Sequence, residues 1–284
     1  NSGVERYLPF KDRHIEVQRT ESVDEETFLL HVETTQSQLR VTQAARLRLA
    51  GNIRGVMRNP LREERRVGQE IEMEVAAGGR VQVEKIVAFH TSRDRASADS
   101  ITDALDTLRR AGTFAELLKP HVLAWAQLWW HADLDTVEVD TDASRWTHMV
   151  VRLHTFHLLQ TASPHTMELD AGIPARGWHG EGYRGHIFWD ELFIFPFLVL
   201  QLPLLARVLL LYRYRRLPAE RIAAEEAGYQ GAMYPWQSGS TGRDETDLMF
   251  LNPRSGRWIK DDTHLQRHVG AAVAYNIWSY YQAT

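Results

Sequence analysis

Residues 80–101 begin with Arg80-Val81-Gln82-Val83-Glu84-Lys85-Ile86-Val87 and, after Thr91-Ser92-Arg93-Asp94, end with Ser97-Ala98-Asp99-Ser100-Ile101. The first run alternates apolar and polar side chains, which is the pattern of a half-buried strand. The last run begins a segment whose apolar residues recur at helical spacing. The period therefore changes near Thr91. A sheet followed by helices is typical of an α+β chain or of two separate domains.

Upstream of Arg80 the chain continues in the strand manner. Three short segments are rich in β-branched residues and are separated by polar or glycine-containing turns: Thr27-Phe28-Leu29-Leu30-His31-Val32, Gln38-Leu39-Arg40-Val41-Thr42 and Glu70-Ile71-Glu72-Met73-Glu74-Val75. Ala77-Gly78-Gly79 predicts a hairpin turn between the last two strands, because glycine alone accepts positive φ cheaply. Residues 1–95 are predicted to form part of an antiparallel β-sandwich.

Downstream of Ser97 the pattern predicts helices only. Thr113-Phe114-Ala115-Glu116 offers a capping box for the start of one helix, with Pro120 near its first turns. Two more candidates cover residues 144–159 and 262–281. We expect the C-terminal two-thirds to be all-helical. The helix after Thr113 is expected to turn these side chains toward a core: Leu117, Val122, Trp125, Leu128 and Trp129.

The apolar run from Leu192 to Tyr212 is long enough to span a bilayer. It contains Pro196 and Pro203, which predict two buried helices with a break near the middle of the run. The cations of Tyr212-Arg213-Tyr214-Arg215-Arg216 are expected to close the second helix, since a helix C-terminus favours positive charge. We therefore expect no membrane span here.

The composition is that of a folded protein. The 284 residues carry a formal charge of −4 with acids and bases interspersed. Nucleic-acid binding needs a clustered basic face, so no nucleic-acid partner is expected. The chain has no cysteine, which excludes disulfides and thiolate metal sites and permits an intracellular location. No charged-then-apolar leader follows Asn1. A cytoplasmic location is the expectation.

The segment most informative about function is Gly180-Glu181-Gly182-Tyr183-Arg184-Gly185-His186-Ile187-Phe188-Trp189-Asp190-Glu191. Its three glycines allow close approach of the backbone to a ligand. Trp189 offers a flat apolar face for a pyranose ring, and Asp190 can accept hydroxyl hydrogen bonds in their stronger, charged form. These features indicate a sugar subsite. The alternative is a loop whose aromatic residues cap a core.

Three segments resemble glycoside hydrolase family 65, which holds the trehalose, maltose and kojibiose phosphorylases and related hydrolases. They are Asp170-Ala171-Gly172-Ile173-Pro174-Ala175-Arg176-Gly177, residues 180–190, and Tyr229-Gln230-Gly231-Ala232-Met233-Tyr234-Pro235-Trp236-Gln237-Ser238-Gly239. The resemblance covers most of the chain. It implies an α+β multidomain fold: part of a β-sandwich over residues 1–95, linker helices over 96–135, and the first part of an (α/α)6 barrel over 136–284.

In that family the sandwich is longer than the part preceding Thr91, and the barrel continues beyond Thr284. The resemblance therefore implies an internal fragment of a longer enzyme. A barrel with so few helices is expected to leave apolar faces open unless another segment covers them.

The activity implied by the resemblance is inverting cleavage of an α-linked disaccharide of the trehalose, maltose, kojibiose or phosphorylated-sugar type. Inversion needs an acid for the leaving oxygen and an attacking group on the opposite face of the sugar. Inorganic phosphate as co-substrate would give β-glucose 1-phosphate, while a hydrolase of the same family uses water. A noncatalytic sugar-binding module is the third interpretation. The family implies no metal and no other cofactor, and it often forms homodimers.

The resemblance also implies roles for individual residues. Trp189 and Asp190 would hold the glucosyl unit where the bond breaks. His186 and Arg184 would contact the ligand or orient Asp190, with an ion pair or a satisfied core polar group as the alternative. These two residues belong to the segment that the family places at the rim of the site: Trp236 and Gln237.

The general acid is assigned to Glu245. In better-known members a glutamate shortly before the last helix has this role, and an alignment on Arg267-His268-Val269-Gly270 lands near Arg257, which is no carboxylate. Glu245 follows the rim segment, and its alternative is a solvated loop charge. Asp261 and Asp262 are the other nearby acids, and an N-cap or first-turn role in the last helix is favoured for them.

Overall fold

The computed structural model describes residues 14–95, 97–134, 141–177, 182–252 and 254–284. Gly180 and Glu181 of the glycine-rich segment lie outside these ranges. The described residues up to Trp125 form one compact unit, and those from Ala126 onward form another.

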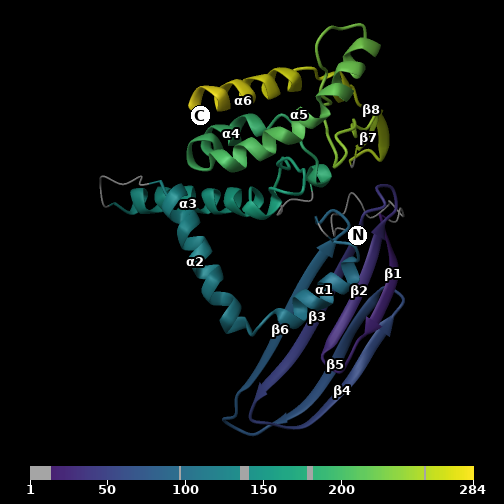
Figure 1. Ribbon diagram of the computed structural model, residues 1–284, viewed down its shortest axis with the longest axis vertical. Coiled ribbons are helices and arrows are strands. Elements are labelled where there is room, and N and C mark those ends of the chain that lie inside the picture. Colours follow the sequence, from purple (N-terminus) through teal and green to yellow (C-terminus); the bar gives the residue numbers. More distant parts are fainter. Residues whose placement is uncertain (1–13, 96, 135–140, 178–181, 253) are drawn as a thin grey trace. The chain divides into compact units, whose positions relative to one another are not determined.

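The first unit is built on antiparallel sheets (Figure 1). One sheet has the strand order β1-β2-β3-β6. Its strands are β1 (Ile15–Ser22), β2 (Thr27–Thr34), β3 (Arg40–Gly51) and β6 (Val81–Thr91). A second sheet pairs β4 (Ile53–Glu63) with β5 (Arg66–Val75). β5 contacts β1 and β2, so the two sheets adjoin. The antiparallel strands expected over residues 1–95 are present, although β1 and β4 were not among the predicted strands.

The hairpin predicted at Ala77-Gly78-Gly79 is wrong, although the turn itself is present. Gly78 has φ +79°, and the N–H of Gly79 donates to the carbonyl of Ala76 at 2.8 Å. However, β5 pairs with β4, and β6 pairs with β3 down to the Gly51 and Val81 pair. The turn therefore connects two sheets. Alternation within a strand shows which face is buried, but it does not identify the neighbouring strand.

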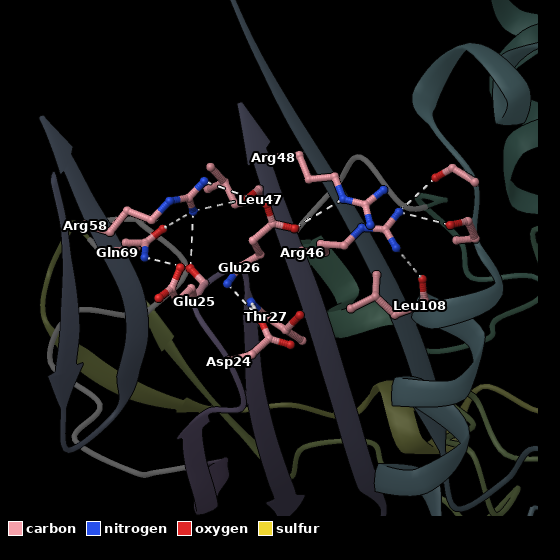
Figure 2. Close-up of polar contacts among 12 residues, drawn as sticks. Asp24, Glu25, Glu26, Thr27, Arg46, Leu47, Arg48, Arg58, Gln69 and Leu108 are labelled. Atoms are coloured by element: carbon pink, nitrogen blue, oxygen red, sulfur yellow. Dashed lines mark hydrogen bonds and ion pairs between the residues drawn. The ribbon is translucent and has the colours of Figure 1, made fainter. Parts of the chain in front are cut away.

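Helix α1 (Ser100–Arg110) covers one face of the larger sheet. Asp99 caps its start by accepting from the N–H groups of Ile101 and Thr102. Its end is held by Arg46 of β3, whose guanidinium donates to the carbonyls of Leu108, Ala111 and Gly112 at 2.9 to 3.0 Å (Figure 2). The hydrophobic core between helix and sheet contains these residues: Leu29, Ala44, Ile86, Ala88, Ala104 and Leu108.

A second polar network ties β4 and β5 to the turn before β2 (Figure 2). Arg58 donates to Gln69 Oε1 at 2.9 Å and to the carbonyl of Glu25 at 3.2 Å, and Gln69 Nε2 donates to that carbonyl at 2.9 Å. A pocket of about 450 Å³ beside this turn is lined by Asp24, Glu25, Glu26, Thr27, Arg46, Arg48 and Arg109. Most of its charged side chains bind neighbouring protein groups, which indicates a structural role.

The second unit is mainly helical. Its elements are α3 (Asp142–Thr161), α4 (Glu191–Gln201), α5 (Pro203–Glu226), α6 (Val269–Ala283), β7 (Met249–Asn252) and β8 (Arg257–Lys260). Helices α4, α5 and α6 contact one another (Figure 1). The break between α4 and α5 at Leu202 confirms the prediction from Pro203, which occupies the first turn of α5. Part of their shared core consists of Phe195, Leu198, Leu205, Ala206 and Leu209.

Helix α2 (Phe114–Ala132) begins with the predicted capping box: Glu116 Oε2 accepts from the N–H of Thr113 at 2.7 Å, and Thr113 Oγ1 accepts from the N–H of Glu116. Its predicted core face is wrong for two residues, because Leu117 and Val122 are exposed. Trp125, Leu128 and Trp129 are half-buried. Apolar spacing predicts the face that a helix would bury, but burial also needs a neighbouring element along its length.

Three expectations about the second unit are wrong. The β7–β8 hairpin interrupts the predicted all-helical region. Helix α5 does not end at Tyr212–Arg216 but continues to Glu226. Its cations Arg213 and Arg216 bind the carboxylates of Glu191 and Asp170 and do not mark a helix terminus. The last helix begins at Val269, since residues 263–265 form a separate 3₁₀ turn. None of the described helices combines the length and apolarity that crossing a membrane requires.

Candidate functional site

Two of the segments singled out in the sequence meet in the structure. The N–H of Ile187 donates to the carbonyl of Ser238, and the N–H of Ser238 donates to the carbonyl of Ile187, both at 2.9 Å. This antiparallel bridge joins the glycine-rich segment to the rim segment across 51 positions of the chain. A second bridge connects Ser238 to Asp244. The backbone therefore fixes these three stretches side by side.

The bridge brings two predicted sugar-binding tryptophans to a common neighbour. Trp189 and Trp236 both meet the ring of His268 edge-on, with centroid distances of 5.6 and 5.4 Å. Both tryptophans are half-buried and pack against the core residues Tyr234, Val269 and Val273. They therefore cap a core and also present partly open rings, which are the two interpretations that the sequence left open.

His268 was not among the predicted site residues. It is exposed, and it stands at the N-terminal end of α6. Its only signal in the sequence was its membership of the run Arg267-His268-Val269-Gly270. That run carried no distinctive chemistry, so the contact with both tryptophans appears only in three dimensions.

Asp190 occupies the residue before α4 and is half-buried. Its carboxylate makes no capping hydrogen bond to that helix, and within the described ranges no other residue pairs with it. A carboxylate at a helix N-terminus that caps nothing retains its capacity to accept hydrogen bonds from a ligand. This arrangement suits the predicted role in binding sugar hydroxyls.

His186 contacts the predicted rim residue Gln237 directly. The Gln237 amide donates to Nδ1 of His186, which requires that nitrogen to be unprotonated. Burial lowers the pKa of His186, the Arg184 cation lowers it further, and the charges of Glu245 and Asp247 oppose the shift. The imidazole is therefore held in its neutral form at neutral pH, with Gln237 itself buried beside it.

Glu245, the predicted general acid, lies in the same neighbourhood. Its N–H donates to the carbonyl of Gln237 at 2.8 Å, and its side chain is half-buried. A Cβ placed on Gly239 would come within 3.1 Å of Glu245 Cγ, so this glycine leaves room for the glutamate. The tertiary structure thus brings Glu245 to His186 and Gln237, which the sequence could only suggest from proximity along the chain.

Arg184 makes an ion pair, which was the expected alternative to a contact with the ligand. Its guanidinium forms an ion pair with Asp247 at 2.8 Å, and both side chains are exposed. Its φ is +52°, and the φ of the neighbouring Tyr183 is also positive, at +64°. Two consecutive non-glycine residues in the left-handed region are unusual and indicate that the surrounding contacts hold this turn.

Asp261 and Asp262 do not start the last helix, so that interpretation is wrong. Asp261 Oδ1 accepts from the N–H of Thr263 at 2.9 Å, next to the start of the short 3₁₀ turn. Asp262 pairs with Lys260 at 2.8 Å. The misplacement follows from the helix start: residues 266–268 separate the 3₁₀ turn from Val269.

Behind the site, Arg213 of α5 and Glu191 of α4 form a buried ion pair with side chains 2% and 4% exposed. Arg213 also donates to Ser238 Oγ at 2.9 Å and to the carbonyl of Phe188 at 3.3 Å. Burial raises the pKa of the Glu191 carboxyl, and the Arg213 guanidinium opposes that rise. None of these contacts was expected from the sequence, where Arg213 was taken for a helix-ending cation.

A second buried acid, Glu220, lies on α5 about two turns after Arg213. Burial raises its pKa to about 7, although the cations Arg213 and Arg216 act in the opposite direction. Its backbone carbonyl accepts from the N–H of Met233 at 2.8 Å.

In the part of the chain covered by the structure, no group of three histidine, aspartate or glutamate residues is arranged to hold a metal ion.

Comparison with protein-family models gives two matches. Residues 1–128 match the model described as "Glycosyl hydrolase family 65, N-terminal domain". Residues 152–284 match "Glycosyl hydrolase family 65 central catalytic domain". The two models together leave only residues 129–151 unmatched, and both belong to the family that the sequence resembled.

Several curated proteins are similar over much of this chain. A Mycobacterium tuberculosis protein described as an uncharacterized glycosyl hydrolase is 47% identical over the whole chain, which spans 21% of that protein. The trehalose 6-phosphate phosphorylase of Lactococcus lactis is 33% identical over the whole chain, which spans 35% of it. The kojibiose phosphorylase of Halothermothrix orenii is 38% identical over 75% of the chain, corresponding to 28% of it. The chain thus spans about a fifth to a third of these relatives.

A solved structure from the human microbiome, whose name gives kojibiose phosphorylase as a provisional activity, has a similar fold. The TM-score is 0.59 at 19% sequence identity, and the match covers 92% of this chain and 32% of that one. The similarity extends over both units, so their order along the chain is shared with that protein.

Proposed function

We propose that this chain, which belongs to glycosyl hydrolase family 65, forms part of an enzyme that cleaves an α-glucosyl disaccharide with inversion of configuration. Inorganic phosphate is the proposed attacking group, and β-glucose 1-phosphate is the proposed product. The names of two similar proteins, trehalose 6-phosphate phosphorylase and kojibiose phosphorylase, support phosphorolysis as the reaction class.

The observation that carries this proposal is the meeting of two sequence segments at the Ile187 and Ser238 bridge. The carboxylate of Asp190, which has no partner among the described residues, follows Trp189 directly in the chain, and the bridge joins their segment to the one that contains Trp236. Aromatic rings beside a free acceptor are the groups that a pyranose needs, because its faces are apolar and its edge carries hydroxyls. The glucosyl unit is proposed to bind there.

Within that site Trp189 supplies the stacking face and Asp190 accepts hydroxyl hydrogen bonds. Trp236 and Gln237 line the rim, with Gln237 also keeping His186 in its neutral form. Arg184 is proposed to act through Asp247, and its ion pair orders the turn before His186. The charge on the attacking phosphate needs cationic or N–H groups, which we assign to another part of the complete enzyme.

Glu245 is the proposed general acid. Its half-buried side chain next to the His186 and Gln237 pair is the support for this role. Proton donation to the leaving oxygen is the one step for which the protein must provide a carboxylic acid in phosphorolysis, because phosphate replaces the second carboxyl. No metal or organic cofactor is required by this scheme.

The packing of α4, α5 and α6 against one another supports the proposal that they begin an (α/α)6 barrel. The proposed domain limits stay those predicted from the sequence, with the barrel part from residue 136 onward. The large exposed apolar side chains include Phe193, Leu200, Leu204, Trp278 and Tyr281. An incomplete barrel is expected to leave such apolar side chains exposed until further helices cover them.

The test uses the full-length enzyme incubated with trehalose, trehalose 6-phosphate, maltose and kojibiose, with and without inorganic phosphate. Glucose 1-phosphate and free glucose are measured separately, and the anomer of the first is determined by NMR. Phosphate-dependent β-glucose 1-phosphate is expected from one of these sugars. Free glucose formed at the same rate without phosphate would identify the alternative, a hydrolase that uses water.

A further control separates a sugar-binding module from an enzyme. If none of the disaccharides is turned over, calorimetric titration with each sugar decides whether binding remains. Binding that disappears in Asp190→Asn without any turnover in the parent protein would establish the module and reject the enzymatic proposal. Turnover that persists unchanged in Glu245→Gln would reject Glu245 as the acid.

A further inference from the structure

Arg213 contacts residues on both sides of each proposed sugar-binding pair. We infer that Arg213 is a positioning residue, which fixes Trp189-Asp190 and Trp236-Gln237 relative to each other. This inference rests on the proposed function of that site, and it adds a residue that the sequence had assigned to the end of a helix.

The first pair is held from both ends. Arg213 Nη2 donates to the carbonyl of Phe188 at 3.3 Å, directly before Trp189. Its Nη2 and Nε donate to Glu191 Oε2 at 3.0 and 3.1 Å, directly after Asp190. Neither Trp189 nor Asp190 can shift along the chain direction without lengthening one of these hydrogen bonds.

The second pair is contacted on both sides as well, once by the side chain of Arg213 and once by its backbone. Arg213 Nη1 donates to Ser238 Oγ at 2.9 Å, directly after Gln237. The hydroxyl of Tyr234, two residues before Trp236, donates to the backbone carbonyl of Arg213 at 3.0 Å. The same arginine thus contacts the flanks of both pairs.

The chemistry of the side chain explains why arginine suits this task. A guanidinium is planar and presents its donors in a rigid fork, so it can satisfy three separate acceptors in fixed directions. Lysine would supply the charge without the fork. Arg213 is 2% exposed on the middle of a 24-residue helix, and Glu191 neutralises it, so the fork has little freedom to move. Precise placement of binding groups is a known source of rate enhancement.

The experiment compares Arg213→Lys with Arg207→Lys in the full-length enzyme. Arg207 is an exposed arginine on the same helix and serves as the matched control. We expect R213K to lower kcat/KM for the disaccharide by about 10- to 100-fold, while R207K leaves it within about twofold. The loss should include a higher KM for the disaccharide and an unchanged KM for phosphate, because Arg213 flanks the sugar-binding residues.

A double variant separates positioning from stability. Glu191→Met with Arg213→Met removes a complete buried ion pair, and such replacements by apolar side chains are often neutral or stabilising. If the melting temperature is retained and kcat/KM still falls, the pair acts on the site. If the melting temperature is retained and kcat/KM is also retained, the inference is overturned.

Two further measurements keep the inference open to disproof. Should R213K and the double variant fail to fold, Ser238→Ala removes a single Arg213 contact, and unchanged sugar kinetics there would reject positioning.

Should the parent enzyme turn over no disaccharide, the proposed function fails, and ¹⁹F NMR of 5-fluorotryptophan-labelled protein tests positioning alone. The Trp189 and Trp236 signals, assigned with Phe variants, are expected to move in R213K and to stay in R207K. Unmoved signals would overturn the inference.

Discussion

Glu191 and Arg213 lie 22 positions apart in the sequence and form a buried ion pair with an Nη2 to Oε2 distance of 3.0 Å. The carboxylate belongs to the first turn of α4 and the guanidinium to the middle of α5. A pair this deeply buried contributes less to stability than its close contact suggests, because both charges lose their hydration. Removing one partner has a much larger effect than removing both.

Glu191→Ala is therefore expected to reduce the free energy of unfolding by about 3 to 5 kcal/mol, since it leaves the Arg213 guanidinium buried without a carboxylate. Guanidinium-induced unfolding of the full-length protein, followed by circular dichroism, measures this. The double Met variant should recover most of the loss. A destabilisation of E191A below about 1 kcal/mol would mean that water reaches Arg213 and replaces the carboxylate.

Asp190→Asn should affect binding and leave folding intact. The carboxylate caps nothing and has no partner among the described residues, so the melting temperature should stay the same. Loss of a charged hydrogen bond to the sugar costs about 1.5 to 3 kcal/mol, and more if the bond strengthens in the transition state. Steady-state kinetics should show a decrease in kcat/KM of about 10-fold or more. Unchanged kinetics would remove Asp190 from the site.

Glu220→Gln should change the pH dependence of stability. The folded-state pKa of Glu220 is raised from 4.5 to about 7, so the folded protein binds this proton more tightly than the unfolded chain. The resulting stabilisation is complete below pH 4.5 and is lost as the pH rises through 7. Glutamine imitates the protonated acid at every pH and does not titrate.

Thermal unfolding of the wild type and E220Q from pH 5 to 8 checks this prediction. The variant should gain stability relative to the wild type as the pH rises, by up to about 3 kcal/mol at pH 8. Glu225→Gln, at an exposed position of the same helix, is the control and should show no such divergence. Parallel pH profiles for wild type and E220Q would mean that Glu220 is ionised in the folded protein at all these pH values.

Gly242→Ala is expected to disturb the loop that follows the rim segment. Gly242 has φ +85°, and a Cβ there would lie 2.1 Å from Cδ of Arg216. Arg216 connects this loop to the rest of the unit, because it donates to the carbonyls of Ser240 and Thr241 and to Asp170. The substitution must therefore displace the arginine as well as strain the backbone.

Gly256→Ala is the matched control for that substitution. Gly256 also has positive φ, at +65°, but a Cβ there meets no heavy atom within 4 Å. We expect G256A to cost about 1 kcal/mol from backbone strain and G242A to cost about 1 to 3 kcal/mol more from the clash. Equal midpoints in chemical denaturation would show that Arg216 moves aside without cost.

Arg46→Met should loosen the end of α1 in the sandwich unit. It removes three hydrogen bonds to buried or half-buried carbonyls (Figure 2), and each acceptor left unsatisfied costs about 1 to 3 kcal/mol. Amide hydrogen exchange in residues 100–112 should accelerate. Arg48→Met removes only an exposed ion pair to Glu26 at 3.2 Å and should change stability by less than about 1 kcal/mol.

Local sequence patterns were sufficient for much of the fold. Three local patterns have their counterparts in the structure: the strand patterns of residues 27–32 and 80–87, the capping box of Thr113 and Glu116, and the break at Pro203. These features depend on neighbours within a few positions of the chain, so a linear reading captures them. The family motifs around Trp189 and Trp236 are also contiguous stretches of the chain, so the sequence alone identifies them.

Pairing between distant residues could not be read in this way. The periodicity of β5 and β6 predicts two strands, yet their partners β4 and β3 depend on which faces are buried in the folded unit. In a helix, likewise, the apolar spacing of Leu117 and Val122 predicts a core face, yet both side chains are exposed. Apolar spacing defines a face, while packing decides whether it is covered.

The chain's own residues also settled the family, because long runs such as 180–191 and 229–239 are specific without any knowledge of their contacts. The tertiary structure alone revealed that Arg213 contacts both segments, that His268 contacts two tryptophans, and that Glu245 adjoins Gln237, the partner of His186. A cation in an apolar run has the same local pattern whether it ends a helix or is buried against a carboxylate. Only the fold brings the partner, 22 positions away, within hydrogen-bonding distance.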